Sequence, residues 1–372
     1  MWLRLPPQKL PGESGMGGRS SVSGLNVALF GATGFLGRYV ANELGSVGSS
    51  VNIANRGCEM ETRHLKPMFD LGNAAFYFYE GRDEASMEAA MEGCDVVINM
   101  VGKRYETKKL VPTDEKGAFK VGGSRVNYSY EEVNVGVAER LAKAATKMGV
   151  PHFIHVSALA AANPETASVW AKSKAAGEGA VKAAFPGATI VRPATLFGHE
   201  DEFLNWYAWM GERLRMPLIG DVPVFGTEGA GAAVLQPVYV GDVATAIMAM
   251  VEDPDSYKGQ TVELAGPADY SRAEIAEFVN DVTKQKKDPV VLPKEAMSAI
   301  AWLVECLNCP YLTVDEVELM DEDIRLVEGK EGVLTFADFP QIERLTPIDE
   351  IAFQYLHRYR SGGHFVYAAG YH

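Results

Sequence analysis

The sequence is poor in cysteine, has no long apolar run and carries no excess of basic residues. Four cysteines among 372 residues are too few for a disulfide framework, which indicates a reducing compartment. No stretch reaches the roughly 18 apolar residues that a membrane-spanning helix needs, so we expect no transmembrane helix. Lys and Arg total 35 against 49 Asp and Glu. This acidic balance disfavours sequence-independent nucleic-acid binding, which depends on cationic contacts to phosphate.

Motifs of metal and hydrolytic centres are also missing. The sequence contains neither Gly-x-Ser-x-Gly nor His-Glu-x-x-His. Cys306 and Cys309 have the Cys-x-x-Cys spacing of zinc and redox sites, but no second pair follows and Pro310 comes next. We therefore predict ordinary buried thiols there and no metal site. The acidic segment 314–332 lacks the spacing of a calcium loop and is typical of a solvated helix face.

From residue 25 onward, short apolar runs alternate with helical patterns. Expected strands are 26–30, 51–54, 75–79, 95–100, 153–157 and 189–193, and the clearest helices between them are 84–92, 131–148 and 170–185. Buried strands that alternate with helices predict an α/β fold with a parallel sheet covered on both faces. We expect a Rossmann-type, doubly wound sheet followed by a smaller, mainly helical C-terminal lobe that is partly interleaved with it.

A glycine-rich turn follows the first expected strand. The stretch "FGATGFLGRYV" places Gly31, Gly34 and Gly37 between that strand and the start of a helix. In a dinucleotide site the first glycine permits the tight turn, the second lets the backbone approach a pyrophosphate, and the third allows close packing of helix on strand. The helix N-terminus offers free N–H groups to the phosphates. The turn also contributes the predicted cofactor contacts Thr33, Phe35 and Leu36.

The end of the second strand favours NADP over NAD. An NAD site usually has Asp or Glu there for the ribose 2′-hydroxyl, whereas this chain has Asn55 and Arg56. Arg38 follows the third glycine directly. Two guanidinium groups near the ribose suit a 2′-phosphate, so we predict NADPH as the cofactor. Either arginine taken alone is equally compatible with a solvated surface residue.

Loops after four other strands complete the expected nucleotide site. Each is ordinary loop chemistry by itself, but their order along the chain fits a dinucleotide that crosses the strand ends. The predicted contacts in these loops are Glu80, Gly81, Asn99, Val101, Gly102, Ser157, Pro193 and Leu196.

The proton donor of a reductase site is missing. "SVWAKSK" holds Lys174 with Trp170 four residues earlier, where hydride-transferring enzymes of this type place a tyrosine. Ser157, which would hold a carbonyl substrate, is retained, and Lys174 can still bind the nicotinamide ribose. An indole N–H is not a titratable acid, so the predicted site is degenerate and has no catalytic residues. Tyr105, Tyr128, Tyr130 and Tyr207 are the tyrosines that could replace the donor in space.

The expected strands, helices and site motifs divide the chain into three predicted parts. Residues 1–24 form an N-terminal extension with only a weak targeting signal, residues 25–250 form the NAD(P)-binding Rossmann domain with a distal insertion at about 201–235, and residues 251–372 form the C-terminal lobe and tail. Asp242 is expected to cap a helix that begins after "LQPVYVG". The apolar segment 296–307 is expected to be a core or partner-facing helix.

The glycine turn, Ser157 and Lys174 resemble the extended and atypical short-chain dehydrogenases. More narrowly, "GGRSSVSG", "FGATGFLGRYV", "RHLKPMFDLG", "VINMVGKRYETK", "RPATLFGHEDEFLN" and "QPVYVGDVATAI" resemble the accessory-subunit family of mitochondrial respiratory complex I that has this fold. The resemblance implies a subunit on the matrix side of the inner membrane, at the junction of the peripheral and membrane arms. It implies tightly bound NADPH, other complex I subunits as partners and a peripheral contact with the membrane.

Two other functions stay open at this point. A soluble NADP-dependent reductase or epimerase-like enzyme would use another acid, and a sensor of NADP(H) would need an exchangeable cofactor. Trp170 favours the non-catalytic subunit over the enzyme, because the residue in that position cannot release a proton.

Overall fold

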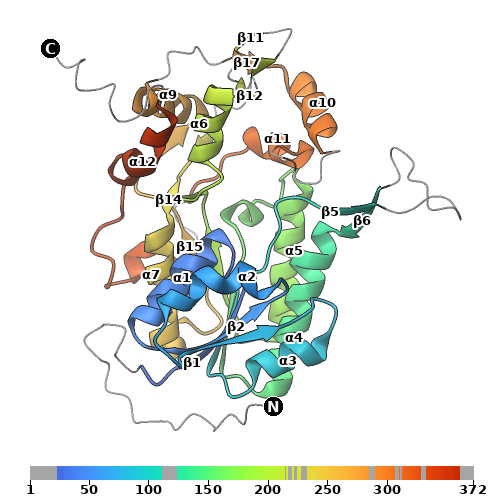
Figure 1. The fold of residues 1–372 in the computed structure, drawn as a ribbon, viewed down its shortest axis with the longest axis vertical. Coiled ribbons are helices and arrows are strands. Elements are labelled where there is room, and N and C mark those ends of the chain that lie inside the picture. The colour runs from blue at the N-terminus through green and yellow to red at the C-terminus, as the bar shows by residue number, and fades with distance from the viewer. Residues whose placement is uncertain are drawn as a thin grey trace, which may run out of the picture.

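A computed structural model describes residues 23–110, 124–213, 215–216, 220–221, 224–227, 233–284, 290–305, 310, 312–327 and 332–360. Its centre is a sheet of eight parallel strands in the order β18-β15-β8-β7-β4-β1-β2-β3 (Figure 1). These strands are β1 Asn26–Phe30, β2 Ser50–Asn55, β3 Ala74–Phe78, β4 Val96–Asn99, β7 His152–Val156, β8 Thr189–Pro193, β15 Thr261–Leu264 and β18 Val333–Leu334. The order reverses at β1 and β4, which is the switch point where a doubly wound sheet binds ligands.

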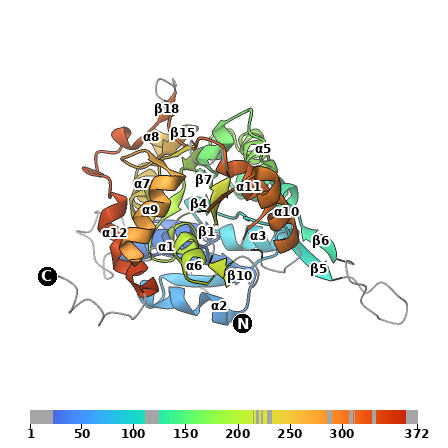
Figure 2. The same ribbon diagram turned by 90° about the horizontal axis from the view of Figure 1, so that it is seen from above.

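Helices cover both faces of the sheet, as Figure 2 shows from above. Side chains alternate along β1: Val27 and Leu29 belong to one core, and Ala28 and Phe30 belong to the other. The first core is closed by α1 Phe35–Ser46 and α7 Val240–Glu252, and the second by α3 Glu84–Met91, α4 Ala138–Met148 and α5 Val169–Ala184. The inner strands β1, β2, β4, β7 and β8 are therefore buried almost throughout, because neither of their faces meets water, whereas Phe78 on the edge strand β3 is 70% exposed.

A smaller lobe lies beyond the carboxyl ends of the strands (Figure 1). One of its cores packs α6 Leu204–Arg213 against α9 Arg272–Thr283 and α12 Ile348–Leu356. A second core lies between α10 Lys294–Val304 and α11 Val314–Met320. Short strand pairs accompany these helices, namely β10 Arg215–Met216 with β11 Gly220–Asp221, β12 Val224–Thr227 with β17 Val290–Leu292, and β13 Val234–Leu235 with β16 Tyr270–Ser271.

Short elements connect these parts. They are α2 Glu59–Thr62, η1 Arg63–Met68, β5 Thr107–Leu110, β6 Ser124–Tyr128, η2 Glu131–Val137, η3 Leu159–Ala162, β9 Leu196–Phe197, β14 Val238–Tyr239, α8 Pro254–Tyr257, η4 Phe336–Asp338 and η5 His357–Tyr359. The β5 and β6 strands pair as an antiparallel arm beside α5 in Figure 1. η2 is a π-helical turn that runs directly into α4.

The α/β class and the doubly wound parallel sheet are confirmed. The division of the chain at residue 250 stays a prediction, because the region after it supplies both the lobe helices and the sheet strands β15 and β18. The predicted cap at Asp242 is wrong: Tyr239 occupies the N-cap position of α7, and Asp242 lies in the first turn. Its carboxylate instead accepts hydrogen bonds from the backbone N–H and hydroxyl of Thr346. Ser271 does form a capping box with Glu274 at the start of α9.

Several sequence predictions fall outside the described residues. They concern most of the N-terminal extension, Cys306, Cys309 and the tail after residue 360. Across the part of the chain that is described, no helix is long and apolar enough to cross a membrane. In that same part, no cluster of histidine, cysteine and acidic side chains is arranged to hold a metal ion.

His152 at the start of β7 gives the fold a predicted acid sensitivity. Its ring is buried, and neither ring nitrogen has a hydrogen-bond partner among the described residues. Burial, helped by nearby Lys258, lowers the pKa of His152 to about 4 from its usual 6.5. Between pH 6.5 and 4, His152 is therefore protonated in the unfolded chain but stays neutral in the folded protein. Stability from this residue is complete above pH 6.5 and falls by about 1.4 kcal/mol per pH unit below it.

We expect His152→Leu to remove this contribution, since leucine does not titrate. In urea unfolding, the free energy of unfolding of the unmodified protein should fall more steeply than that of the variant as pH falls from 6.5 to 4. If the two free energies of unfolding changed in parallel across this pH range, the lowered pKa assigned to His152 would be wrong.

Candidate functional site

The glycine turn has the geometry that a dinucleotide loop requires. Gly31 has a φ of +88°, and a Cβ on it would lie 2.9 Å from the backbone carbonyl carbon of Met100. A Cβ on Gly37 would lie 2.2 Å from the carbonyl oxygen of Gly31, so helix α1 approaches β1 as closely as glycine allows. Gly34 occupies the N-cap position of α1 without a side-chain cap. The first N–H groups of the helix are thus available to a phosphate.

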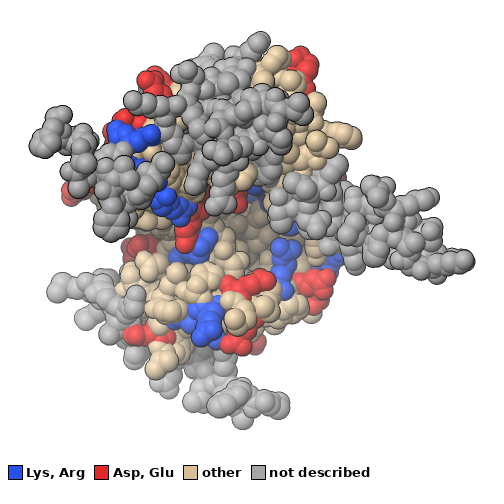
Figure 3. Space-filling view, turned by 45° about the horizontal axis from the view of Figure 1, so that its top comes forward, with Lys and Arg blue, Asp and Glu red and all other residues tan. Residues whose placement is uncertain are grey.

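A cavity of about 540 Å³ opens beside this turn. Figure 3 shows the molecule hollowed between the sheet domain and the lobe, with basic and acidic side chains beside the hollow. Ten of the predicted cofactor contacts line the cavity: Gly31, Gly34, Phe35, Leu36, Gly37, Gly102, Ser157, Lys174, Pro193 and Leu196. The structure thus brings the glycine turn and the degenerate reductase residues to one cavity. The opposite wall comes from α6, α9 and α11 of the lobe.

Buried polar groups gather around Lys174 on α5. The lysine is 6% exposed, and its Nζ lies 2.8 Å from where a Cβ on Gly102 would be. Burial lowers the pKa of Lys174 to about 8, against the opposing charge of Glu178 one turn later. His155 is buried beneath it, and burial together with the charge of Lys174 lowers the pKa of His155 to about 3. His155 is therefore neutral, and Lys174 is the cation at this end of the cavity.

Ser157 ends β7 at the same end of the cavity. It is 6% exposed, and its hydroxyl has no hydrogen-bond partner in the described part of the chain. Asn134, on the π-helical turn η2, donates to the hydroxyl of Ser173, while its Oδ1 is likewise buried without a partner. Buried polar atoms normally have partners. Of these two residues, Ser157 lines the cavity, and its unpartnered hydroxyl favours a polar ligand at this end.

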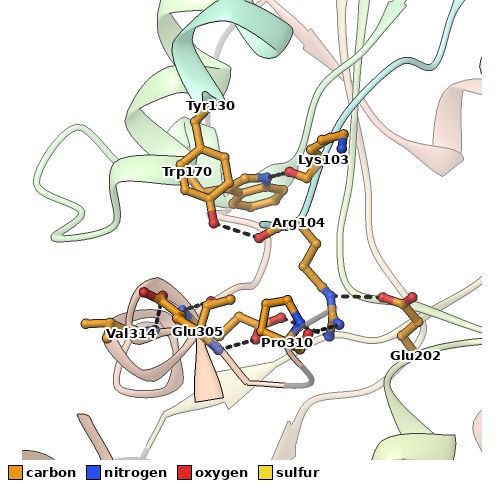
Figure 4. Close-up of polar contacts among 10 residues, drawn as sticks. Lys103, Arg104, Tyr130, Trp170, Glu202, Glu305, Pro310 and Val314 are labelled. Carbon is orange, nitrogen blue, oxygen red and sulfur yellow. Dashed lines mark hydrogen bonds and ion pairs between the residues drawn. The ribbon is translucent and has the colours of Figure 1, made fainter. Parts of the chain in front are cut away.

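Trp170 lies in the first turn of α5 and lines the same cavity. Its indole Nε1–H donates to the backbone carbonyl of Lys103 at 2.8 Å (Figure 4). The residue in the acid position is thus committed to holding the loop after β4. It has no second polar atom to offer to a substrate.

The next residue of that loop, Arg104, joins three parts of the structure (Figure 4). Its Nε lies 3.0 Å from a carboxylate oxygen of Glu202, and its Nη1 lies 3.1 Å from one of Glu316. Its Nη2 donates to the carbonyl of Pro310 at 3.1 Å, while its own carbonyl accepts from the hydroxyl of Tyr130 at 2.7 Å. We call this set the Arg104 bridge. It links the sheet domain, the loop before α6 and the lobe across the cavity.

A lobe residue also caps the helix that carries Trp170 and Lys174. The carboxylate of Asp315 accepts hydrogen bonds from Ser168 Oγ at 2.7 Å and from the backbone N–H groups of Val169 and Trp170 at 2.6 and 3.2 Å. A negative group at a helix N-terminus satisfies free N–H groups and favours the helix dipole. The position of α5, and with it that of Lys174, therefore depends on the lobe.

The arginines predicted to recognise a 2′-phosphate have different surroundings. Arg38 forms an ion pair with Glu200. Arg56, at the end of β2, is exposed, and its guanidinium carbon lies 5.5 Å from the centre of the Tyr128 ring. Within the described residues Arg56 takes part in no ion pair. Of the two arginines, Arg56 is thus the one whose guanidinium remains available for a phosphate.

The remaining predicted contacts do not line the cavity. Asn99 is fully buried, with its amide shared between the ring of His155 and the backbone N–H of Val101. The carbonyl of Gly81 accepts from Arg140, and Glu80 is exposed. Thr33 and Asn55 are half-buried. Their roles toward a nucleotide stay predictions.

Sequence reasoning missed the residues that couple the cavity to the lobe, namely Arg104, Glu202, Asp315 and Glu316. The only available signal was local: "TVDE" at 313–316 is a capping-box pattern, and Thr313 and Glu316 do form that box. That pattern predicts a helix start and does not say what the intervening Asp315 binds.

Comparisons with known proteins agree with this fold. The model of the NmrA-like family matches residues 25–331. The chain is 36% identical over 362 residues to NADH dehydrogenase (ubiquinone) 1 alpha subcomplex subunit 9, mitochondrial, from Arabidopsis thaliana, covering 94% of this chain and 82% of that protein. It is 34% identical over 352 residues to the NADH-ubiquinone oxidoreductase 40 kDa subunit, mitochondrial, from Neurospora crassa, covering 94% and 83%.

Among solved structures, triphenylmethane reductase from Citrobacter sp., complexed with NADP(H), has a TM-score of 0.60 at 16% identity over 88% of this chain and 99% of that chain. This likeness shows the fold alone. The sequence matches extend over nearly the whole chain and most of each relative. The chain therefore belongs to the NmrA-like family and to the family of the mitochondrial alpha subcomplex subunit 9 proteins.

Proposed function

We propose that the chain holds NADPH in this cavity without turning it over, as an accessory subunit of mitochondrial complex I. The observation that carries the non-catalytic part is Trp170, whose indole occupies the acid position and bonds to the carbonyl of Lys103. Ser157 and Lys174 remain at the cavity wall. The chain thus keeps Ser157 and Lys174, which would bind a nucleotide, but lacks the tyrosine that would supply the proton.

The residues present fit a dinucleotide. The turn at Gly31 and the uncapped start of α1 suit the pyrophosphate. Lys174 and the unpartnered hydroxyl of Ser157 would bind the nicotinamide ribose and carboxamide side. Arg56 would bind the 2′-phosphate, which makes NADPH the expected form. When bound, NADPH supplies a hydride donor, and this chain's own residues would position that donor and shield it from water.

The four tyrosines named as substitutes differ in their place relative to the cavity. The hydroxyl of Tyr130 is bonded to the carbonyl of Arg104, and burial together with Asp315 and Glu316 raises its pKa further above its usual value. Tyr128 stacks with Arg56 and Arg82 at the other end of the site. Of the four, Tyr207 alone lines the cavity. A reductase that used another acid would depend on Tyr207, which makes this residue the test of that alternative.

The relatives support the assignment to complex I by their names. We infer that the partners of this chain are other subunits of that complex, on the matrix side of the inner membrane with a peripheral membrane contact. Bound NADPH would stabilise the folded chain by mass action, by about 4 kcal/mol when the free nucleotide is ~1,000-fold above its Kd. The chain would thereby support assembly and stability of the junction between the peripheral and membrane arms.

Affinity purification from mitochondria tests this assignment. With a tag on the full-length chain, we expect the other complex I subunits to copurify in stoichiometric amounts, and extraction with acid or base to release one NADP(H) per chain. Recovery of the tagged chain alone, as a free monomer or dimer, would contradict the subunit role. Recovery of the assembly with NAD(H) or with no nucleotide would contradict only the cofactor assignment.

A further inference from the structure

The cavity extends well beyond the part that a nicotinamide ring would fill. Its far wall is formed by Phe203, Trp206, Leu312, Leu319, Met320 and Ile324. We call this part the outer chamber. None of these residues belongs to the glycine turn or to the degenerate reductase residues. The outer chamber is part of the cavity of about 540 Å³. Its apolar walls with a few polar groups are typical of small-molecule sites.

The charged side chains around the outer chamber already have partners. Arg104 pairs with Glu202 and Glu316 in the Arg104 bridge. Asp315 caps α5, and Arg272 donates to the backbone carbonyls of Leu319 and Met320. An anionic ligand on Arg104 would compete with Glu316, whose side chain is only 22% exposed, and leaving that largely buried carboxylate unpaired is costly. The chamber is therefore suited to a neutral molecule.

One indole donor of the outer chamber has no partner. The Nε1–H of Trp206 is buried without a hydrogen-bond partner among the described residues. An indole N–H can only donate. A buried donor left without an acceptor costs about 1–3 kcal/mol, which an acceptor oxygen on a ligand would recover. The occupant should therefore carry a carbonyl oxygen on an otherwise apolar body.

We propose that the outer chamber binds a neutral acyl compound, an ester or an amide with an apolar chain, next to the bound nucleotide. The proposal rests on the proposed function, since the inner part of the cavity is assigned to NADPH. An ester or amide carbonyl accepts a hydrogen bond but is a poor hydride acceptor, and Trp170 offers no proton. The occupant is held beside the nicotinamide and is not reduced.

Matched ligands test the chemistry of the chamber. The probes are N,N-dimethyloctanamide, which is neutral and only accepts hydrogen bonds, and octanoate, which has the same chain and a charge. We expect the NADPH-loaded protein to bind one amide per chain in calorimetry and to bind octanoate at least ten-fold more weakly. Equal affinity for the two probes would overturn the neutral-ligand assignment, and so would the absence of amide binding.

Matched variants test the location. Leu319→Trp should fill the chamber and abolish amide binding, while the same exchange at Leu303, which is exposed on α10 of the same lobe, should leave it unchanged. Trp206→Phe keeps the ring and removes the N–H, so it should weaken amide binding about five-fold, the equivalent of one ordinary hydrogen bond. Amide binding that survives Leu319→Trp would overturn the proposal.

NADPH affinity is measured for every variant in the same way. It should stay unchanged, which shows that each variant is folded and that the inner site is intact. A protein that binds NADPH but no amide would refute the chamber and leave the proposed function standing. A protein that fails to bind NADPH would refute the proposed function itself.

Discussion

Replacing Arg192 by methionine is expected to lower the free energy of unfolding by about 3–5 kcal/mol. Arg192 on β8 lies between two buried carboxylates. Its Nη2 is 2.6 Å from Glu178 and its Nη1 is 3.0 Å from Glu263, and those side chains are only 5% and 1% exposed. Without the arginine, two negative charges remain buried next to each other. Urea unfolding of the nucleotide-free protein at pH 7 measures the loss.

Two companion variants make this result specific. Arg344 pairs with Glu350 on the surface, where both side chains are more than half exposed, so Arg344→Met should cost less than about 1 kcal/mol. Adding Glu178→Gln and Glu263→Gln to Arg192→Met should recover part of the loss, because the buried charges are then gone. A loss at Arg192 no larger than that at Arg344 would contradict the assigned energetic role.

Replacing Arg56 by alanine is expected to weaken NADPH binding by about 10- to 100-fold and to leave NADH binding unchanged. Arg56 is the predicted partner of the 2′-phosphate that only NADPH carries, whereas Arg38 is already paired with Glu200. A charge-assisted hydrogen bond contributes about 1.5–3 kcal/mol, and about 1.4 kcal/mol corresponds to ten-fold in affinity. Calorimetric titration of the protein with each nucleotide measures both affinities.

Arg63→Ala is the matched control, because Arg63 is also an exposed arginine and lies in η1, beyond the end of β2 that carries Arg56. It should leave both affinities within two-fold of the unmodified protein. If Arg56→Ala left NADPH affinity unchanged, or lowered NADH affinity as much, the 2′-phosphate assignment would be wrong.

Sequence patterns correctly predicted those features of the structure that are determined by residues close together in the sequence. The strand 189–193 was placed correctly, and so was the glycine turn between β1 and α1. The positive φ of Gly31 and the close approach of Gly37 to the Gly31 carbonyl both arise within a few residues. Asp242 was misjudged for the opposite reason. An acid near a helix start is typical of a cap, but the position of Thr346, 104 residues later, decided its partner.

The coupling between cavity and lobe had no local signature. Arg104 and Pro310 are 206 residues apart. Asp315 accepts a hydrogen bond from the backbone N–H of Trp170, which lies 145 residues earlier. Single charged residues of this kind usually lie in water, so nothing in the pattern marked them. The identity of Trp170 could be read directly, whereas its hydrogen bond to the carbonyl of Lys103 required the fold.

The most direct test of the central claim is whether the bound nucleotide reacts. Purified protein loaded with NADPH is mixed with aliphatic and aromatic aldehydes and ketones, and absorbance at the nicotinamide band is followed alongside the variants Lys174→Met and Tyr207→Phe. We predict that the unmodified protein oxidises NADPH no faster than Lys174→Met, so that any slow loss is unrelated to the site. Turnover that is lost in both Lys174→Met and Tyr207→Phe would contradict the claim and identify a reductase that uses Tyr207 as its acid.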